Sequence, residues 1–162
     1  MLKQVYTIGV YGFTPESFFQ ALRDAGVDTL CDIRLRRGVR GAEYAFANSL
    51  RLQDALARRG IRYRHWIELA PALELRKLQY ASDRETKTAK RQRQELCPEY
   101  IERYSAEYLR SEKFQPLLEA LEPEEQVIAL FCVETEPAAC HRSLVAKRLG
   151  ACLGLEVQHL MP

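Results

Sequence analysis

The sequence predicts an α/β fold, a three-layer sandwich of the Rossmann-like kind with a mainly parallel sheet. Three short runs have the length and the apolar, β-branched composition of buried strands: Val5–Tyr11, Asp28–Ile33 and Val127–Val133. Segments whose apolar residues recur at helical spacing follow these runs. Strands that alternate with helices are typical of parallel βαβ units with right-handed crossovers.

The N-terminal half contains signals for two helices and a further strand. Thr14 stands before a proline and is expected to be the N-cap of the first helix. A second helix is expected from Asn48 or Ser49 to Arg59. Residues 61–66 alternate between apolar and polar side chains, which predicts the third strand.

The middle of the chain is much more polar. Seven Lys or Arg residues lie between Leu75 and Glu95. We interpret residues 70–96 as a charged helical insertion, a solvated helix or loop, within a single domain that spans residues 1–162. Pro98 is expected to begin a more regular helix, and the apolar residues at 114–121 predict another.

A polar turn that follows the strand at 127–133 is the centre of the predicted site. The helix after this turn is expected to run from Cys140 to Gly150, and Leu155–Leu160 is expected to be the last strand. Open α/β sheets bind ligands at the carboxyl ends of their strands, beside the start of the next helix. The reactive side chains gathered there are Cys132, Glu134, Cys140, His141, Arg142 and Ser143.

Four motifs resemble those of the DUF488 family of small, mostly prokaryotic proteins. They are T-I-G at 7–9, D-I-R at 32–34, H-W-x-E-L-A at 65–70 and C-V-E-x-x-P-x-x-C-H-R-S at 132–143, in the order of the family. The resemblance implies an α/β fold and a shared polar site, and it implies no established reaction. It marks these positions: Gly9, Asp32, Arg34, Cys132, Glu134, Pro137, Cys140, His141 and Arg142.

The chain departs from the family pattern in two places. Val10 and Tyr11 stand where the family usually has a histidine and a small hydroxyl residue. The loop after D-I-R carries Arg36, Arg37 and Gly38, where the family often has prolines.

Four residues are candidates for catalysis: Asp32, Glu134, Cys140 and His141. A helix N-terminus offers free N–H groups and a positive dipole end, which hold anions and lower the pKa of a thiol such as that of Cys140. The carboxylates of Asp32 and Glu134 could each serve as a general base, a magnesium ligand or a ribose-hydroxyl acceptor. Structural ion pairs with Arg34 or Arg142 are equally compatible with these positions.

A second group of residues is predicted to bind an anionic substrate: Gly9, Arg34, Arg36, Arg37, Arg142 and Ser143. The arginine-rich loop at 34–40 follows the second strand and lies on the ligand side of the predicted sheet. Secondary candidates are Tyr11, His65 and Cys132. The basic stretch from Arg76 to Arg93 is interrupted by carboxylates, so we interpret it as a solvated surface.

Composition narrows the class of protein. Apolar content of 47% and charged content of 28% are ordinary for a globular protein, and a net charge of +2 does not by itself indicate a nucleic-acid binder. No apolar run reaches the roughly 20 residues of a membrane span. The odd number of cysteines, five, favours reduced thiols in the cytoplasm.

Known cysteine motifs fit poorly. The Cys-x5-Arg loop of cysteine phosphatases is absent, because Ala138 and Ala146 stand six residues after Cys132 and Cys140. Cys132, Cys140 and His141, with His65 or His159, could supply soft metal ligands. The spacing C-x7-C-H is not that of a zinc finger, however, and adjacent Cys and His side chains rarely converge, so no metal is predicted and the cofactor stays open.

The leading interpretation is an intracellular enzyme that acts on a phosphate-bearing nucleotide or nucleic-acid substrate at the carboxyl ends of the strands. One alternative is a non-catalytic module that binds nucleic acid or a nucleotide through the same basic corner. The other is a metal or redox thiol protein that uses Cys132 and Cys140. We expect an anionic small molecule or nucleic acid as the partner and no membrane, and the oligomeric state stays open.

Overall fold

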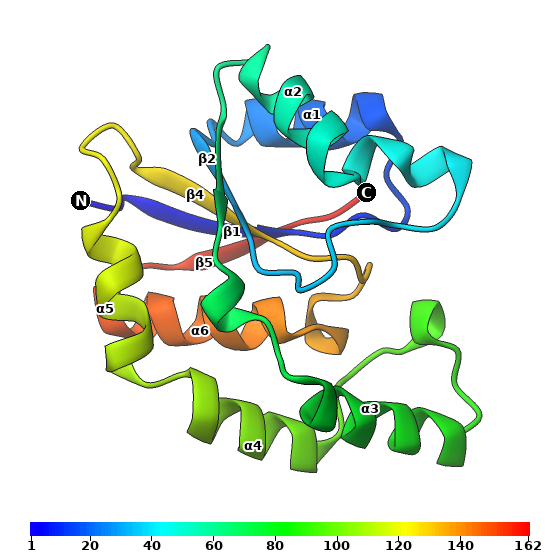
Figure 1. Ribbon diagram of the computed structural model, residues 1–162. Helices are drawn as coiled ribbons and strands as arrows, with labels where there is room; N and C mark the ends of the chain where they lie inside the picture. Colours follow the sequence, from blue (N-terminus) through cyan, green and yellow to red (C-terminus); the bar gives the residue numbers. More distant parts are fainter.

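The computed structural model describes residues 1–162 and is built around one five-stranded sheet in the order β3-β2-β4-β1-β5 (Figure 1). Every neighbouring pair of strands is parallel. The strands are β1 (Gln4–Ile8), β2 (Thr29–Asp32), β3 (Arg62–His65), β4 (Val127–Phe131) and β5 (Val157–Leu160). The predicted α/β sandwich is therefore confirmed, and its sheet is wholly parallel.

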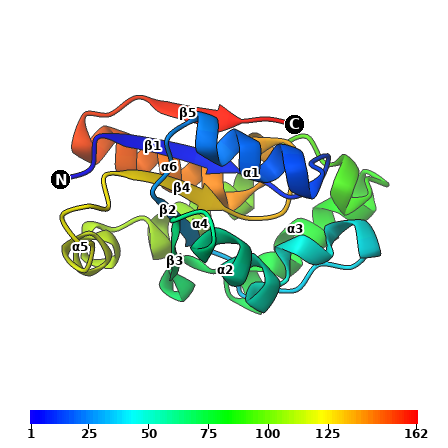
Figure 2. The same ribbon diagram turned by 90° about the horizontal axis from the view of Figure 1, so that it is seen from above.

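Helices cover both faces of the sheet, which makes three layers (Figures 1 and 2). One face carries α1 (Pro15–Asp24) and α2 (Ser49–Ala57). The other carries α6 (His141–Leu153), with α3 (Leu73–Glu85), α4 (Pro98–Tyr108) and α5 (Ser111–Glu119) beyond it. Four short 3₁₀ turns complete the chain: η1 (Ala42–Ala47), η2 (Ile67–Leu69), η3 (Lys90–Gln92) and η4 (Pro137–Ala139).

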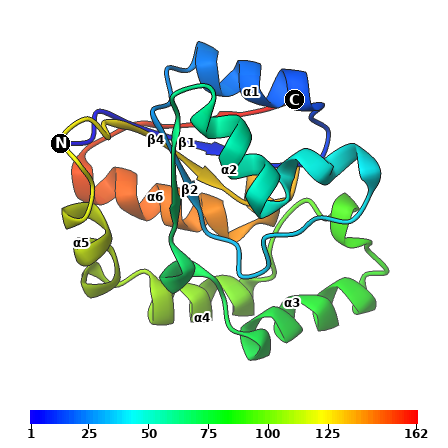
Figure 3. The same ribbon diagram turned by 45° about the horizontal axis from the view of Figure 1, so that its top comes forward.

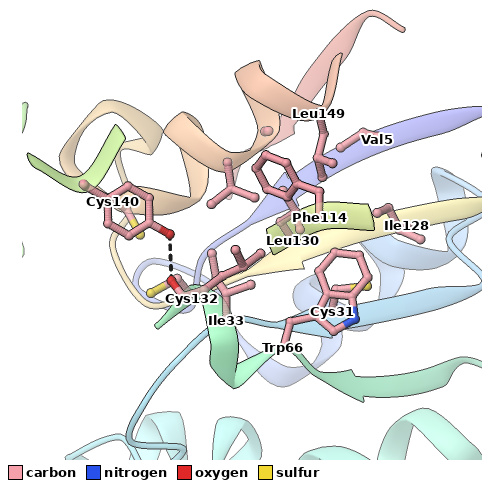
Figure 4. Packing of buried hydrophobic residues seen from close by; sticks show 14 of the residues in the cluster. Val5, Cys31, Ile33, Trp66, Phe114, Ile128, Leu130, Cys132, Cys140 and Leu149 are labelled. Carbon is pink, nitrogen blue, oxygen red and sulfur yellow. Dashed lines mark hydrogen bonds between the residues drawn. The ribbon is translucent and has the colours of Figure 1, made fainter. Parts of the chain in front are cut away.

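Each face of the sheet has its own apolar core. Alternate residues of a strand point to opposite faces, so Leu30 and Ala129 join the cluster under α1 and α2, whereas Cys31 and Leu130 join the cluster under α6. Figure 4 shows the second cluster, with Cys132 and Cys140 at one end of it. The end of this core therefore forms part of the predicted site.

Two of the predicted boundaries that are wrong have a clear physical cause. The helix expected to end at Gly150 continues to Leu153, and Gly154 ends it in the left-handed conformation, at φ 67°. Gly150 is instead a packing position, because a Cβ there would lie 2.7 Å from the carbonyl oxygen of Leu155. The first strand ends at Ile8, since the amides of Val10 and Tyr11 both bond to the carbonyl of Val133 in the loop after β4.

The charged segment at 70–96 contains α3 and η3, and both lie on the side of the molecule at which the strands end (Figure 3). Leu75 and Gln79 are the buried residues of α3. The side-chain oxygen of Gln79 accepts a bond of 2.8 Å from the amide of Cys97, which ties α3 to the start of α4. None of the helices combines the length and the apolar composition that a bilayer-spanning segment needs.

Replacing Gly150 by alanine is expected to destabilise the fold by about 1–3 kcal/mol, because the added methyl group would press on Leu155 and Val157. In an ordinary helix interior the same change would stabilise by about 1 kcal/mol. Urea unfolding measures the difference, with the exposed position Lys147→Ala as the control, which is expected to stay within about 0.5 kcal/mol of the wild type. A Gly150→Ala protein more stable than the wild type would show that α6 and β5 are not in close contact.

Candidate functional site

A pocket of about 450 Å³ opens at the carboxyl ends of the central strands. Its walls come from the loops after β1, β2 and β4 and from α3 and η3. Tyr11 follows β1, Arg34 follows β2 and Cys132 follows β4, and all three line it. This is the edge at which a parallel sheet is expected to bind its ligand.

The lining of this pocket is strongly cationic. Six of its side chains are basic and none is a carboxylate; the basic residues are Arg34, Arg36, Arg40, Arg76, Lys90 and Arg91. Of these, Arg34 pairs with Asp32, and Lys90 lies 3.8 Å from Glu134. The remaining four guanidinium groups have no carboxylate within ion-pair distance. The positive charge of the pocket is therefore largely uncompensated.

Asp32 is held in a closed set of hydrogen bonds. The side chain of Arg34 donates two hydrogen bonds to the carboxylate, from Nε to Oδ1 at 2.9 Å and from Nη2 to Oδ2 at 2.8 Å. The hydroxyl of Tyr63 donates to Oδ2 at 2.6 Å, and Arg37 donates to that hydroxyl at 3.3 Å. Asp32 is completely buried and lines neither this pocket nor the one beneath it, and Arg37 also lies outside both. Of the two interpretations of Asp32, the geometry matches the structural ion pair.

A smaller pocket of about 90 Å³ lies beneath the basic one, and the two share several walls, including Cys132 and His141. Glu134 and Cys140 also line the smaller pocket. Three of the four catalytic candidates thus share one pocket. We call Cys132, Glu134, Cys140 and His141 the thiol–carboxylate cluster.

Cys140 and His141 converge although they are adjacent in the chain. The Sγ atom of Cys140 lies 3.8 Å from Nδ1 of His141, and Nε2 of His141 is 3.1 Å from the carbonyl oxygen of Ile33. The ring of Tyr104 packs edge-on against the imidazole at 5.5 Å. Ile33 and Tyr104 therefore hold the ring with Nδ1 toward the sulfur. The expectation that this Cys–His pair would diverge is wrong.

The two thiols differ in acidity because of their surroundings. Burial raises the pKa of Cys140, but the hydrogen bond from Cys132 and the charges of His141 and Arg142 outweigh burial and hold it well below its usual value. The pKa of Cys132 is raised, first by the hydrogen bond to Cys140 and then by burial. Cys140 at the N-cap of α6 is thus the more acidic thiol of the pair.

Glu134 is a buried carboxylate with one free oxygen. Its Oε1 accepts from Nη2 of Arg93 at 3.2 Å and lies 3.8 Å from Nζ of Lys90, whereas its Oε2 has no hydrogen-bond partner. Burial, followed by the negative charge of Cys140, raises the pKa of Glu134 to about 7 against the opposing effects of the nearby cations. The free oxygen belongs to a residue that lines the inner pocket.

Gly9, Arg142 and Ser143 support the turn after β4 and do not line the basic pocket. Arg142 is completely buried, and its Nη1 and Nη2 donate to the carbonyl oxygens of Glu134 at 2.7 Å and Thr135 at 3.3 Å. The hydroxyl of Ser143 donates to the carbonyl oxygen of Cys140 at 2.9 Å. The guanidinium predicted to hold an anion thus binds the chain's own carbonyl groups.

The secondary candidates separate into two kinds. Tyr11 and Cys132 line the basic pocket, and the guanidinium of Arg91 lies over the Tyr11 ring at 4.5 Å. His65 lines neither pocket; its Nε2 is 2.8 Å from the carbonyl oxygen of Arg34, so it contacts the loop after β2 from outside.

Sequence reasoning missed the contribution of the charged segment. Arg76, Tyr80, Lys90, Arg91 and Arg93 all come from residues interpreted as a solvated surface. The only signal for them is the spacing of Arg76 and Tyr80, four residues apart on one face of α3 and next to its buried residues at 75 and 79. That spacing indicates that the two residues share a helix face, but it does not show which part of the protein this face packs against.

The model of a domain of unknown function, DUF488, matches residues 14–149. The chain belongs to the DUF488 family. The matched range contains D-I-R, H-W-x-E-L-A and the C-H-R turn, whereas T-I-G at 7–9 lies before it. No curated protein and no solved structure shows significant similarity to the chain.

Replacing Gly9 by alanine is expected to destabilise the protein by at least about 2 kcal/mol, because the added Cβ would lie 2.1 Å from the carbonyl oxygen of Glu134. Gly38→Ala is the matched control, since a Cβ there would meet only Asn48, at 3.7 Å. The control is expected to be neutral or to stabilise by up to about 1 kcal/mol. Denaturant unfolding compares the two, and equal stabilities would contradict the close approach of Gly9 to the turn.

Proposed function

We propose that this DUF488 protein is a cytoplasmic enzyme that binds a phosphate-bearing nucleotide in the basic pocket and acts on it at the thiol–carboxylate cluster. The observation that carries the proposal is the junction of the two pockets. A cationic pocket without carboxylates leads directly to buried thiol, imidazole and carboxylate groups. A substrate held by its phosphate above would present its remaining atoms to the reactive groups below.

The unpaired guanidinium groups favour an anionic ligand, and a phosphate fits them well. Arg36, Arg40, Arg76 and Arg91 have no ion-pair partners, and Nε of Arg76 is buried without any hydrogen-bond partner. A guanidinium offers parallel N–H donors that match two oxygens of a phosphate. Because the chain as a whole carries only +2, this local concentration of charge is specific to the pocket.

The size and walls of the pocket favour a mononucleotide over a polynucleotide. A volume of about 450 Å³ lies within the range of small-molecule sites. Tyr11 and Arg91 both line it, and the guanidinium of Arg91 lies over the Tyr11 ring at 4.5 Å. The outer face of this guanidinium is a surface on which a base can stack. A module that tracks a nucleic-acid backbone would need a longer open groove.

A second candidate function rests on a separate observation. The Sγ atoms of Cys132 and Cys140 lie within 4.8 Å of one another, and neither sulfur is in a disulfide. A redox thiol protein would use this pair to form a disulfide under oxidation. Mass spectrometry of the protein after mild peroxide treatment would detect that bridge.

Loss of the Arg36 and Arg40 side chains is expected to weaken nucleotide binding at least about tenfold, since each guanidinium can supply a charged hydrogen bond. Isothermal titration with nucleoside monophosphates, diphosphates and inorganic phosphate measures this in an Arg36→Ala/Arg40→Ala protein. The matched control is Arg58→Ala/Arg103→Ala, which removes two exposed arginines, one at the C-cap of α2 and one in α4, each paired with a carboxylate one helical turn away.

The control is expected to bind as the wild type does. Equal weakening in both proteins would show that only overall charge matters. Binding of polynucleotides alone, with a steep loss of affinity as salt rises, would favour the non-catalytic nucleic-acid module instead.

A further inference from the structure

We propose that Cys132, Cys140 and His141 bind one zinc ion, with its fourth position open to the inner pocket. The ligand atoms of these three residues, two sulfurs and one ring nitrogen, lie within 4.8 Å of one another. Metal binding is inferred from the structure of the site and does not depend on the proposed function. Only the use of the metal, to activate an atom of the nucleotide or a water, rests on that function.

The distances are close to those of a formed site. At bond lengths of about 2.0–2.3 Å, the sulfur and nitrogen ligands of tetrahedral zinc lie roughly 3.4–3.8 Å apart. The Sγ of Cys140 and Nδ1 of His141 are already 3.8 Å apart. Small movements of side chains would bring Cys132 to the same separation. Two thiolates and one imidazole are the soft donor set that zinc prefers.

The surroundings of the histidine are those of a metal ligand. Nε2 of His141 is 3.1 Å from the carbonyl oxygen of Ile33. Donation of the Nε2–H proton to that carbonyl leaves the lone pair of Nδ1 directed at the sulfurs. A ligating histidine usually has its other nitrogen fixed in this way. Cys140 also stands at the N-cap of α6, where the helix end favours a thiolate.

A separate observation supports a ligand site in the inner pocket. Oε2 of Glu134, on a side chain only 5% exposed, has no hydrogen-bond partner, and Glu134 lines the pocket together with the three ligands. A buried oxygen without a donor is costly. A water in the fourth position of the zinc would supply that donor. Three protein ligands and one water are the arrangement of catalytic zinc sites, with the carboxylate beside the water and not on the metal.

The charges also balance. Two thiolates neutralise Zn²⁺, so the occupied site adds no net charge to the apolar end of the core. Glu134 keeps its own counter-charges, Arg93 and Lys90. The cationic pocket above then retains its positive charge for the phosphate of the substrate.

Titration of the metal-free, reduced protein with zinc chloride against a chromophoric chelator tests the inference. The wild type and Cys152→Ser, which removes an exposed thiol, are expected to bind one zinc ion per chain. Cys132→Ser and Cys140→Ser are expected to bind at least 100-fold more weakly. Zinc bound equally by all four proteins, or absent from the folded wild type at saturating zinc, would overturn the proposal.

Cobalt substitution of the wild type keeps the test decisive if a serine variant fails to fold. Cobalt in a site with two thiolates gives a sulfur-to-metal charge-transfer band and intense visible bands of tetrahedral geometry. A spectrum of octahedral, oxygen-ligated cobalt would overturn the proposal. Nucleotide titrations of the zinc-free protein keep the two proposals apart, because the basic pocket binds phosphate whether or not the metal is present.

Discussion

The geometry of the site depends on one buried guanidinium, that of Arg142. It joins the first turn of α6 to the turn after β4 through the carbonyl oxygens of Glu134 and Thr135. Gly9 leaves the space in which the Glu134 carbonyl can approach β1. A buried cation without such partners would cost several kcal/mol, so the turn and the helix are held in one arrangement. Cys132 and Cys140 meet because they flank this braced segment.

Two further buried arginines fix the other walls in the same way. Arg34 holds Asp32 and donates to the carbonyl of Ala47 at 3.0 Å, which ties the loop after β2 to η1. Arg93 pairs with Asp83 and Glu134 and also donates to the carbonyl of Ala139, which ties the charged segment to the turn after β4. Each wall is therefore anchored by a guanidinium whose fork bridges two chain segments. Lysine has a single charged centre and could not bridge them in this way.

The fold and the position of the site in it could both be predicted from the sequence. Thr14 caps α1 as its hydroxyl and spacing predict, and the C-H-R turn lies at the carboxyl ends of the strands because a strand–turn–helix passage in a parallel sheet can place it nowhere else. The roles of single arginines could not be predicted. The fork of Arg142 fits two carbonyl groups as well as a phosphate, and only the path of the backbone decides between them. The face of α3 that carries Arg76 was expected to be solvated, because the loop that it faces across the pocket lies far away in the sequence.

The arginines around the site are of two kinds. Some bind other parts of the chain and hold the walls in place, and others have no partner in the protein. Arg34, Arg93 and Arg142 are buried and donate hydrogen bonds to oxygens of the chain itself, so they stabilise the walls. Arg36 and Arg40 line the same pocket without any carboxylate within ion-pair distance, so their charges are available to a ligand. A phosphate in the basic pocket would supply the missing counter-charge, and the cluster beneath, neutral when it holds zinc, would not weaken that attraction.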